Sequence, residues 1–257
     1  MIPTDHVVAE LRRRELAPPA FQSLFLAGSL VRGWGHARSD ADAYLIVDEP
    51  WAGPSNADIS VRLNPPKVPA NVFDLDDRRW EVRYWQAGQV DELLAKVSWA
   101  AFEGGAVLSN LTVPESILLA RLPYAHPIAG SGWLERRQEE LAKSAFRAIV
   151  ITRLLSTAES GVEDALGLLE SGDDRAAVLA AQAAFLALVD AFTAYHGDVG
   201  FEVKWRARRI AELGSPVLPA DAFWDVVTMR GLDPDRPRAW VESVLLRCRE
   251  LSLEVEI

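Results

Sequence analysis

Short apolar runs, each closed by glycine, proline or acidic residues, dominate the first half of the chain. The runs FQSLFLAG and DADAYLIVDE have the continuous apolar character of buried strands. DISVRL and RRWEVRYWQ predict two further strands, the second with clear alternation of apolar and polar positions. Helical spacing of apolar residues precedes and follows these runs, in residues 4–15, with Thr4 or Asp5 as the N-cap, and in QVDELLAKV. The first 125 residues therefore predict a mixed β-sheet with helices.

Helical periodicity replaces the strand pattern from about Pro114 onward. Thr112 and Glu115 have the spacing of a capping box, which marks the start of a helix. Longer helices are expected over residues 133–158 and 173–195, and over the segments VKWRARRIAEL and WVESVLLRCREL. Helices of this length joined by short loops are typical of an antiparallel bundle. We therefore predict an α+β protein, with a sheet domain over residues 1–125 and a helical domain over residues 126–257.

Composition and charge exclude several classes of partner. Hydrophobic residues make up 49% of the chain, which is ample for a buried core. The 27 basic and 37 acidic residues give a net charge of -10, which repels a nucleic-acid backbone, so no nucleic-acid partner is expected. The acidic balance favours a cationic small molecule, although a solubilising surface explains it equally well. Cys248 is the only cysteine, which excludes an internal disulfide and a thiolate zinc site.

The pattern of apolar residues also bears on location. The first residues lack the apolar core of a signal peptide. The most apolar helical segments retain Lys, Arg, Gln or Asp, so no run is expected to reach the length of a membrane span. We therefore expect a cytoplasmic protein with no membrane partner.

The segment AGSLVRGWGHARSDADAYLIV concentrates the candidate chemistry. Asp40 and Asp42 are two positions apart at the start of a strand, so their side chains point the same way. Two such carboxylates repel each other unless one is protonated or a cation lies between them, and magnesium accepts carboxylates together with substrate phosphates. At the Gly28-Ser29 turn, backbone amides and the serine hydroxyl can donate to phosphate oxygens. The segment therefore predicts a cradle for a triphosphate.

GSLVRGWGHARSDADAYLIV resembles the signature of the nucleotidyltransferase superfamily related to DNA polymerase beta. That signature is a hydrophobic strand, a Gly-Ser turn, about ten residues and an Asp-x-Asp pair inside a second strand. The matching words are Gly28-Ser29, Arg32-Gly33 and Ser39-Asp40-x-Asp42. Ala41 and Ala43 depart from the bulkier apolar residues that are usual there, which affects strand packing more than chemistry. The resemblance implies two Mg²⁺ ions held by the carboxylates and a nucleoside triphosphate, most simply ATP, as the donor.

The family also uses a third carboxylate on a later strand, and Glu81 is our choice. Alternation places Glu81, Arg83 and Trp85 on one face of their strand. A charge in so apolar a strand is costly unless it is paired or bound to metal. Asp77 or Asp76 is the alternative, although a turn over Asp74, Asp76 and Asp77 explains acidic residues there. Glu81 would complete a metal site or act as a general base, and the resemblance to antibiotic-modifying members favours the base.

Other polar residues have both a functional and an ordinary interpretation. Arg32 could bind phosphate or be a solvated loop residue, and Ser39 belongs to the matched motif. Resemblance to the helical domains of antibiotic-type members implies that Lys204 could reach the triphosphate, whereas a surface lysine paired with Glu202 is the alternative. Asp190 could bind a substrate amine or form a salt bridge.

Two further side chains are candidates for stacking on a ligand. Trp34 lies in the loop of the matched motif, and Trp85 shares the face of Glu81.

The function implied is transfer of AMP from ATP to a hydroxyl of a small-molecule acceptor. Antibiotic-type adenylyltransferases fit the length and layout best, which suggests an aminoglycoside or lincosamide-like acceptor and a role in antibiotic resistance. One alternative is a toxin–antitoxin nucleotidyltransferase that modifies a protein or RNA. Another is a non-catalytic nucleotide-binding module. Whether two chains form a homodimer is left open.

Overall fold

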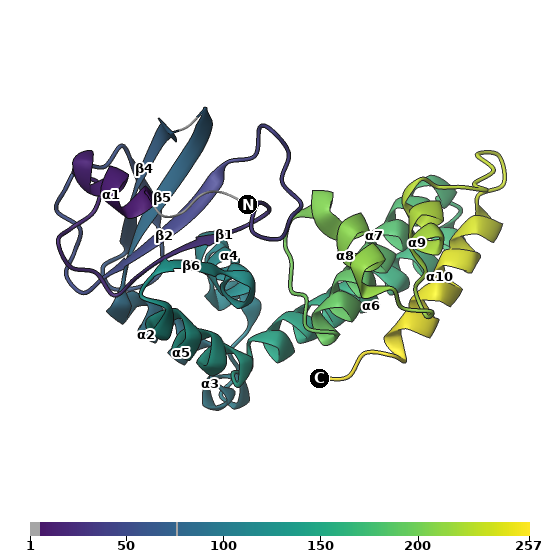
Figure 1. Cartoon of the computed structure of the whole chain (residues 1–257). Helices are drawn as coiled ribbons and strands as arrows, with labels where there is room; N and C mark the ends of the chain where they lie inside the picture. Colours follow the sequence, from purple (N-terminus) through teal and green to yellow (C-terminus); the bar gives the residue numbers. More distant parts are fainter. Residues whose placement is uncertain (1–5, 76) are drawn as a thin grey trace. The chain divides into compact units, whose positions relative to one another are not determined.

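The computed structural model describes residues 6–75 and 77–257, and it divides into two compact units (Figure 1). The sheet unit ends at Phe146 and the helical unit begins at Arg147. This division falls later than the boundary expected after residue 125, because residues 126–146 belong to the sheet unit. Their strand pairs with the sheet, and the helix that follows contacts the same sheet. The proposed N-caps Thr4 and Asp5, and the alternative acid Asp76, lie outside the described residues.

A six-stranded mixed sheet forms the centre of the first unit, in the order β3-β4-β5-β2-β1-β6. The strands are β1 (Ser23–Ala27), β2 (Ala41–Val47), β3 (Ala57–Ser60), β4 (Lys67–Leu75), β5 (Arg78–Gln86) and β6 (His126–Ala129). β2 and β5 pair in parallel, and the other neighbours pair antiparallel. The predicted α+β class is confirmed.

Two of these strands, β4 and β6, were not predicted from the sequence. β4 contains Pro69 and Asn71, residue types that strands disfavour, so the apolar pattern is interrupted. The buried side chain of Asn71 is nevertheless satisfied, because its amide donates to the carbonyl oxygen of Pro54 and to the hydroxyl of Tyr84. β6 has only four residues, too few for a period-two pattern to be recognised.

The two faces of the sheet have different roles. One face packs with Val7 and Leu11 of α1 (Val7–Arg13) in a continuous apolar cluster. That cluster takes alternate residues of the central strands: Leu24, Leu26, Ala41, Ala43, Leu45, Val47, Trp80, Val82 and Tyr84. The intervening residues therefore point to the opposite face. In Figure 1, α2 (Ala87–Lys96) and α5 (Ser131–Ala142) lie across the sheet from α1.

The other helices of the sheet unit are short. They are α3 (Trp99–Glu103) and α4 (Val113–Arg121). Thr112 and Glu115 form the predicted capping box at the start of α4, in which each side chain meets the backbone of the other residue.

The second unit is helical. Its helices are α6 (Phe146–Ser171), which begins at the division, α7 (Asp174–Tyr195), α8 (Arg206–Leu213), α9 (Ala220–Val227) and α10 (Arg238–Ser252). α9 was not predicted. The single helix expected over residues 133–158 is two helices, α5 and α6, because the hydroxyl of Ser144 donates to the carbonyl of Leu141 and accepts from the amide of Phe146. Such local side-chain bonds compete with helix continuation.

α7 is the central helix of this unit. Gly161 of α6 permits a close approach, because a Cβ there would lie 3.0 Å from that of Ala184 in α7. By length and composition α7 could also span a membrane, with a mean hydropathy of 1.8, so the expectation that no run reaches that length is wrong. In the structure 61% of this stretch is buried inside the protein, which is how a core helix passes the same test.

Candidate functional site

The parallel pairing of β2 and β5 brings two of the predicted acids together. Asp42 and Glu81 occupy paired positions in the register. Equivalent residues of adjacent strands point to the same side, so both carboxylates emerge on the face turned away from α1. Both are mostly buried, with 14% of the Asp42 side chain and 23% of the Glu81 side chain exposed. Two of the three predicted acids, Asp42 and Glu81, therefore lie side by side on one face of the sheet.

Asp40 lies just before the start of β2 and is more open. Its side chain is 40% exposed, and its Oδ2 is 3.8 Å from Nε of Arg79, which is itself 58% exposed. At such exposure an ion pair is weak. Asp40 is thus free to adjust its side chain, unlike Asp42.

Arg83 bridges the two buried acids, a role that was not predicted from the sequence. Its Nε and Nη2 donate to the two oxygens of Glu81 at 2.9 and 2.8 Å, and Nη2 lies 3.1 Å from Oδ1 of Asp42. Its Nη1 donates to the hydroxyl of Tyr44 at 2.7 Å. Alternation already placed Arg83 on the face of Glu81, so the pairing could have been read from the i, i+2 spacing.

A second arginine reaches the same place from a helix. Arg121, the last residue of α4, places Nη1 2.9 Å from Oδ1 of Asp42 and 3.2 Å from the Tyr44 hydroxyl. No local pattern predicts these contacts, because Arg121 is 77 positions from Tyr44 along the chain and still farther from Asp42. Asp42, Glu81 and the two arginines form what we call the arginine-paired acid cluster.

Electrostatics keep this cluster charged. Burial by itself would lower the pKa of Arg83, but the oxygen of Tyr44 and the carboxylates of Asp42 and Glu81 raise that pKa above its ordinary value. Arginine is not deprotonated in proteins, so Arg121 is a cation as well, and two guanidinium groups face two carboxyl groups within the cluster.

The Gly28-Ser29 turn lies directly against Asp42. Gly28 has φ of +82°, and a Cβ at this position would lie 2.5 Å from Oδ2 of Asp42. The carbonyl of Ser29 accepts the amides of Trp34 and Gly35 at 2.8 and 3.0 Å, which folds the segment back on itself. Only glycine allows the backbone to come this close to the carboxylate.

Arg32, in the same segment, stacks between aromatic rings. Its guanidinium carbon is 3.6 Å from the ring centre of Trp34 and 4.0 Å from that of Tyr124. Contacts of this kind fix the direction of a guanidinium. Its role in phosphate binding stays a prediction. Trp34 is buried beneath it, and Trp85 is also buried, so neither presents a free ring face as a ligand platform.

Ser39 is used by the loop itself. Its hydroxyl accepts the amide of His36 at 2.9 Å, and its carbonyl accepts Nη1 of Arg78 at 2.6 Å. Arg78 begins β5, so these bonds attach the loop before Asp40 to the strand that carries Glu81. Ser39 therefore positions the acids, whatever it contributes to phosphate binding.

The alternative third acids are placed differently. Asp77 has φ of +57° in the turn between β4 and β5, as expected for a turn residue. Asp74, also expected in the turn, lies instead within β4 and is paired with Arg79 of β5. Both border an open pocket of about 740 Å³ together with His6 and Glu10, residues at the start of α1. Because α1 packs on the face opposite to Asp42, these acids do not join the cluster.

The helical unit contains the two remaining candidates, Lys204 and Asp190. Lys204 lies in a short turn, Val203–Trp205, with Nζ 5.2 Å from the ring centre of Trp205, and its role toward a triphosphate stays a prediction. Asp190 accepts Nη2 of Arg206 at 2.6 Å and Nη2 of Arg209 at 3.0 Å. The salt-bridge interpretation of Asp190 is confirmed.

Magnesium is the ion that the expected chemistry requires, and the donor types fit it. Asp42 and Glu81 offer adjacent carboxylates, the hard oxygen ligands that Mg²⁺ prefers. Within residues 6–75 and 77–257, however, no three His, Cys, Asp or Glu side chains lie close enough together to hold a metal ion. Arg83 is bonded to oxygens that would coordinate a cation, so metal and guanidinium compete for them.

Comparison with known proteins supports the fold. No family model and no curated protein matches the chain. A crystal structure described as a nucleotidyltransferase-like protein from Exiguobacterium sibiricum is similar, with a TM-score of 0.51 and 11% sequence identity, over 97% of this chain and 74% of that chain. At this identity the likeness shows the fold and leaves activity open. The chain shares its α+β fold with a nucleotidyltransferase-like protein.

Proposed function

We propose that this protein is a nucleotidyltransferase that moves a nucleoside monophosphate, AMP from ATP in the first instance, to a hydroxyl of a small-molecule acceptor. The observation that carries the proposal is the register of β2 and β5. It sets Asp42 beside Glu81, next to a glycine turn, in a chain with a nucleotidyltransferase-like fold.

Each residue has a role in this proposal. Asp42 would hold Mg²⁺ together with phosphate oxygens, and Asp40 and Glu81 are the further ligands we expect. For this the exposed side chain of Asp40 has to turn toward Asp42, and Glu81 has to leave Arg83. The ion would offset negative charge at the α-phosphorus and on the leaving pyrophosphate. Backbone amides at Gly28 and Ser29 would receive phosphate oxygens. Arg32 and Ser39, and Lys204 from the helical unit, are the further candidates for phosphate contact.

The proposed reaction exchanges one bond at the α-phosphorus for another. The acceptor hydroxyl oxygen forms a bond to the α-phosphorus, while the bond from that phosphorus to the oxygen bridging the β-phosphate breaks. The electron pair leaves with pyrophosphate. The hydroxyl proton goes to a general base, for which Glu81 is our candidate; the alternative role for Glu81 is to complete the metal site. Either role requires Arg83 to release at least one of the Glu81 oxygens.

The test is pyrophosphate release from labelled ATP, GTP, CTP and UTP with an acceptor panel. Asp42→Asn should abolish magnesium-dependent turnover, and Glu81→Gln should retain nucleotide binding but suppress transfer. Asp58→Asn is the matched control, because Asp58 is an exposed acid on edge strand β3 whose partner is Lys67. Normal transfer by Glu81→Gln would remove Glu81 from the mechanism.

A cationic acceptor is our first choice. The net charge of -10 favours it, and aminoglycosides and lincosamides are the first members of the panel. Selective pyrophosphate release with one of them would support a role in antibiotic resistance. Equal background with every acceptor would contradict this choice.

One observation favours a second candidate, a nucleotide-binding module without transfer activity. The charges of Asp42 and Glu81 are already balanced by Arg83 and Arg121. Binding of Mg²⁺ and a nucleotide without pyrophosphate release, across the full panel, would favour the module over the enzyme.

A further inference from the structure

The arginine-paired acid cluster has no net charge before any ligand binds. Asp42 and Glu81 contribute two negative charges, and Arg83 and Arg121 contribute two positive charges. All four side chains are largely buried, between 14% and 23% exposed. Charges in such surroundings interact more strongly than they do in water, so any added charge must be balanced locally.

The charge of a divalent cation that binds without a nucleotide would be poorly compensated in this cluster. It would add two positive charges beside two guanidinium groups that cannot lose their protons. It would also have to take oxygens that Arg83 already occupies with a two-pronged contact to Glu81. A bound triphosphate supplies further negative charge. Its oxygens attract the cation, and they also attract the guanidinium of Arg83 once that group has left Glu81.

We propose that Arg83 is a positioning residue that reserves the Asp42–Glu81 pair for a divalent cation arriving with a nucleoside triphosphate. This inference rests on the proposed function. The free cation binds weakly because Arg83 already fills its place, and the metal–nucleotide complex binds well because Arg83 moves from the carboxylates to phosphate oxygens. Metal and nucleotide therefore bind with positive coupling.

Arg83 is better placed for this role than Arg121. It is on the same strand as Glu81 and contacts both acids, with a two-pronged contact to Glu81. Both arginines donate to the Tyr44 hydroxyl, so Arg121 still has this acceptor when Arg83 moves away.

The experiment titrates Mn²⁺ into the full-length protein by calorimetry, first alone and then as a complex with a non-hydrolysable ATP analogue. For Arg83→Gln we expect the affinity for Mn²⁺ alone to rise by about tenfold, a typical size for coupling between ligands. The affinity for the complex should not rise. The preference of the protein for the complex over the free ion should therefore fall by about tenfold or more.

Two variants control for charge and geometry. Arg13→Gln removes one positive charge from exposed α1, on the far face of the sheet, and should leave Mn²⁺ affinity unchanged. Arg83→Lys keeps the positive charge but loses the two-pronged contact of the guanidinium, so part of the preference for the metal–nucleotide complex over free Mn²⁺ should remain. Circular dichroism checks folding, and if Arg83→Gln does not fold, Arg121→Gln takes its place with a smaller expected rise.

The outcomes separate this inference from the proposed function. Equal affinity of wild-type protein and Arg83→Gln for Mn²⁺ alone, with the complex still bound by both, would overturn the inference and leave the function standing. Binding of the complex by neither protein would overturn the proposed function and the inference with it.

Discussion

Gly28 controls how closely the backbone approaches the acid cluster. Its positive φ is unfavourable for other residues, and a Cβ would overlap Oδ2 of Asp42. Gly33 follows in the same segment with φ of +71°, yet nothing lies within 4 Å of its Cβ position. A side chain at Gly28 would therefore cause both backbone strain and steric overlap, whereas a side chain at Gly33 would cause backbone strain alone.

We expect Gly28→Ala to lower the free energy of unfolding by about 2–4 kcal/mol, because strain and overlap act together. Gly33→Ala should cost only about 1 kcal/mol, the strain alone. Urea denaturation measures both. Gly28→Ala should also weaken binding of the metal–nucleotide complex, since Asp42 must move. Equal losses of stability in the two variants would show that the contact with Asp42 has no energetic effect.

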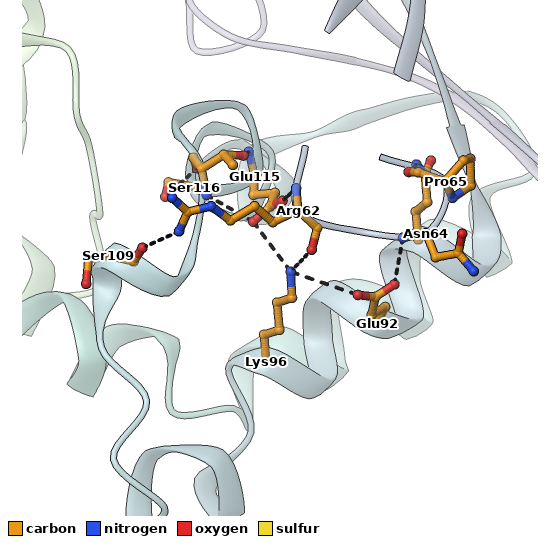
Figure 2. A network of polar contacts seen from close by, with 10 residues as sticks. Arg62, Asn64, Pro65, Glu92, Lys96, Ser109, Glu115 and Ser116 are labelled. Carbon is orange, nitrogen blue, oxygen red and sulfur yellow. Dashed lines mark hydrogen bonds and ion pairs between the residues drawn. The ribbon is translucent and has the colours of Figure 1, made fainter. Parts of the chain in front are cut away.

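At the scale of elements, Glu115 ties a loop and two helices together (Figure 2). Its side chain is fully buried at the start of α4, where it accepts the amide of Thr112 at 3.0 Å and the amide of Arg62 from the loop after β3. Nζ of Lys96, at the end of α2, lies 3.8 Å from it and also donates to the carbonyl of Arg62. α4 carries Arg121, so this network also supports the acid cluster from a distance.

Glu115→Ala is expected to lower the free energy of unfolding by about 2–4 kcal/mol, because it leaves two buried backbone amides without their acceptor and removes one partner of Lys96. Lys96 keeps the carbonyl of Arg62 and the carboxylate of Glu92. Thr112→Ala removes only the hydroxyl of the capping box and should cost about 1 kcal/mol. Thermal or urea unfolding compares the two variants. A loss for Glu115→Ala no larger than that for Thr112→Ala would mean that Glu115 acts only as a cap.

Over the whole molecule, each unit has its own core. The sheet unit buries the apolar faces of its strands, and the helical unit buries much of α7. Cys248 of α10 is 2% exposed in the helical unit, and burial raises the pKa of its thiol to about 12. This thiol therefore reports on the helical unit alone.

We expect Cys248 to be almost unreactive toward a thiol reagent at pH 8 in the native protein, and to react quickly in urea. Because the pKa of the folded thiol exceeds its ordinary value of 9.0, this group favours folding below that pH and destabilises the helical unit as pH rises above it. Labelling rates at several pH values measure this. Rapid labelling under native conditions would show that α10 opens locally.

Local patterns predicted the elements that hold the candidate site. Apolar runs located β1 and β2, and alternation along β5 placed Glu81 and Arg83 on one face. The Thr112–Glu115 spacing predicted the start of α4. These features depend on residues within a few positions of one another, and such short-range order is what a single sequence records best.

Local patterns in the chain were enough to predict the α+β class, the Gly-Ser turn and the Asp-x-Asp pair, and to select Glu81 as the candidate third acid, which stays a prediction. The three-dimensional arrangement was needed to see that β2 and β5 pair in register, that β4 and β6 complete the sheet, and that the sheet unit extends to Phe146. It also brought Arg121 to Asp42, so that the acids are balanced by arginines. The physical reason is that strand pairing and charge pairing join distant residues, whose meeting depends on how the whole core packs rather than on any local period.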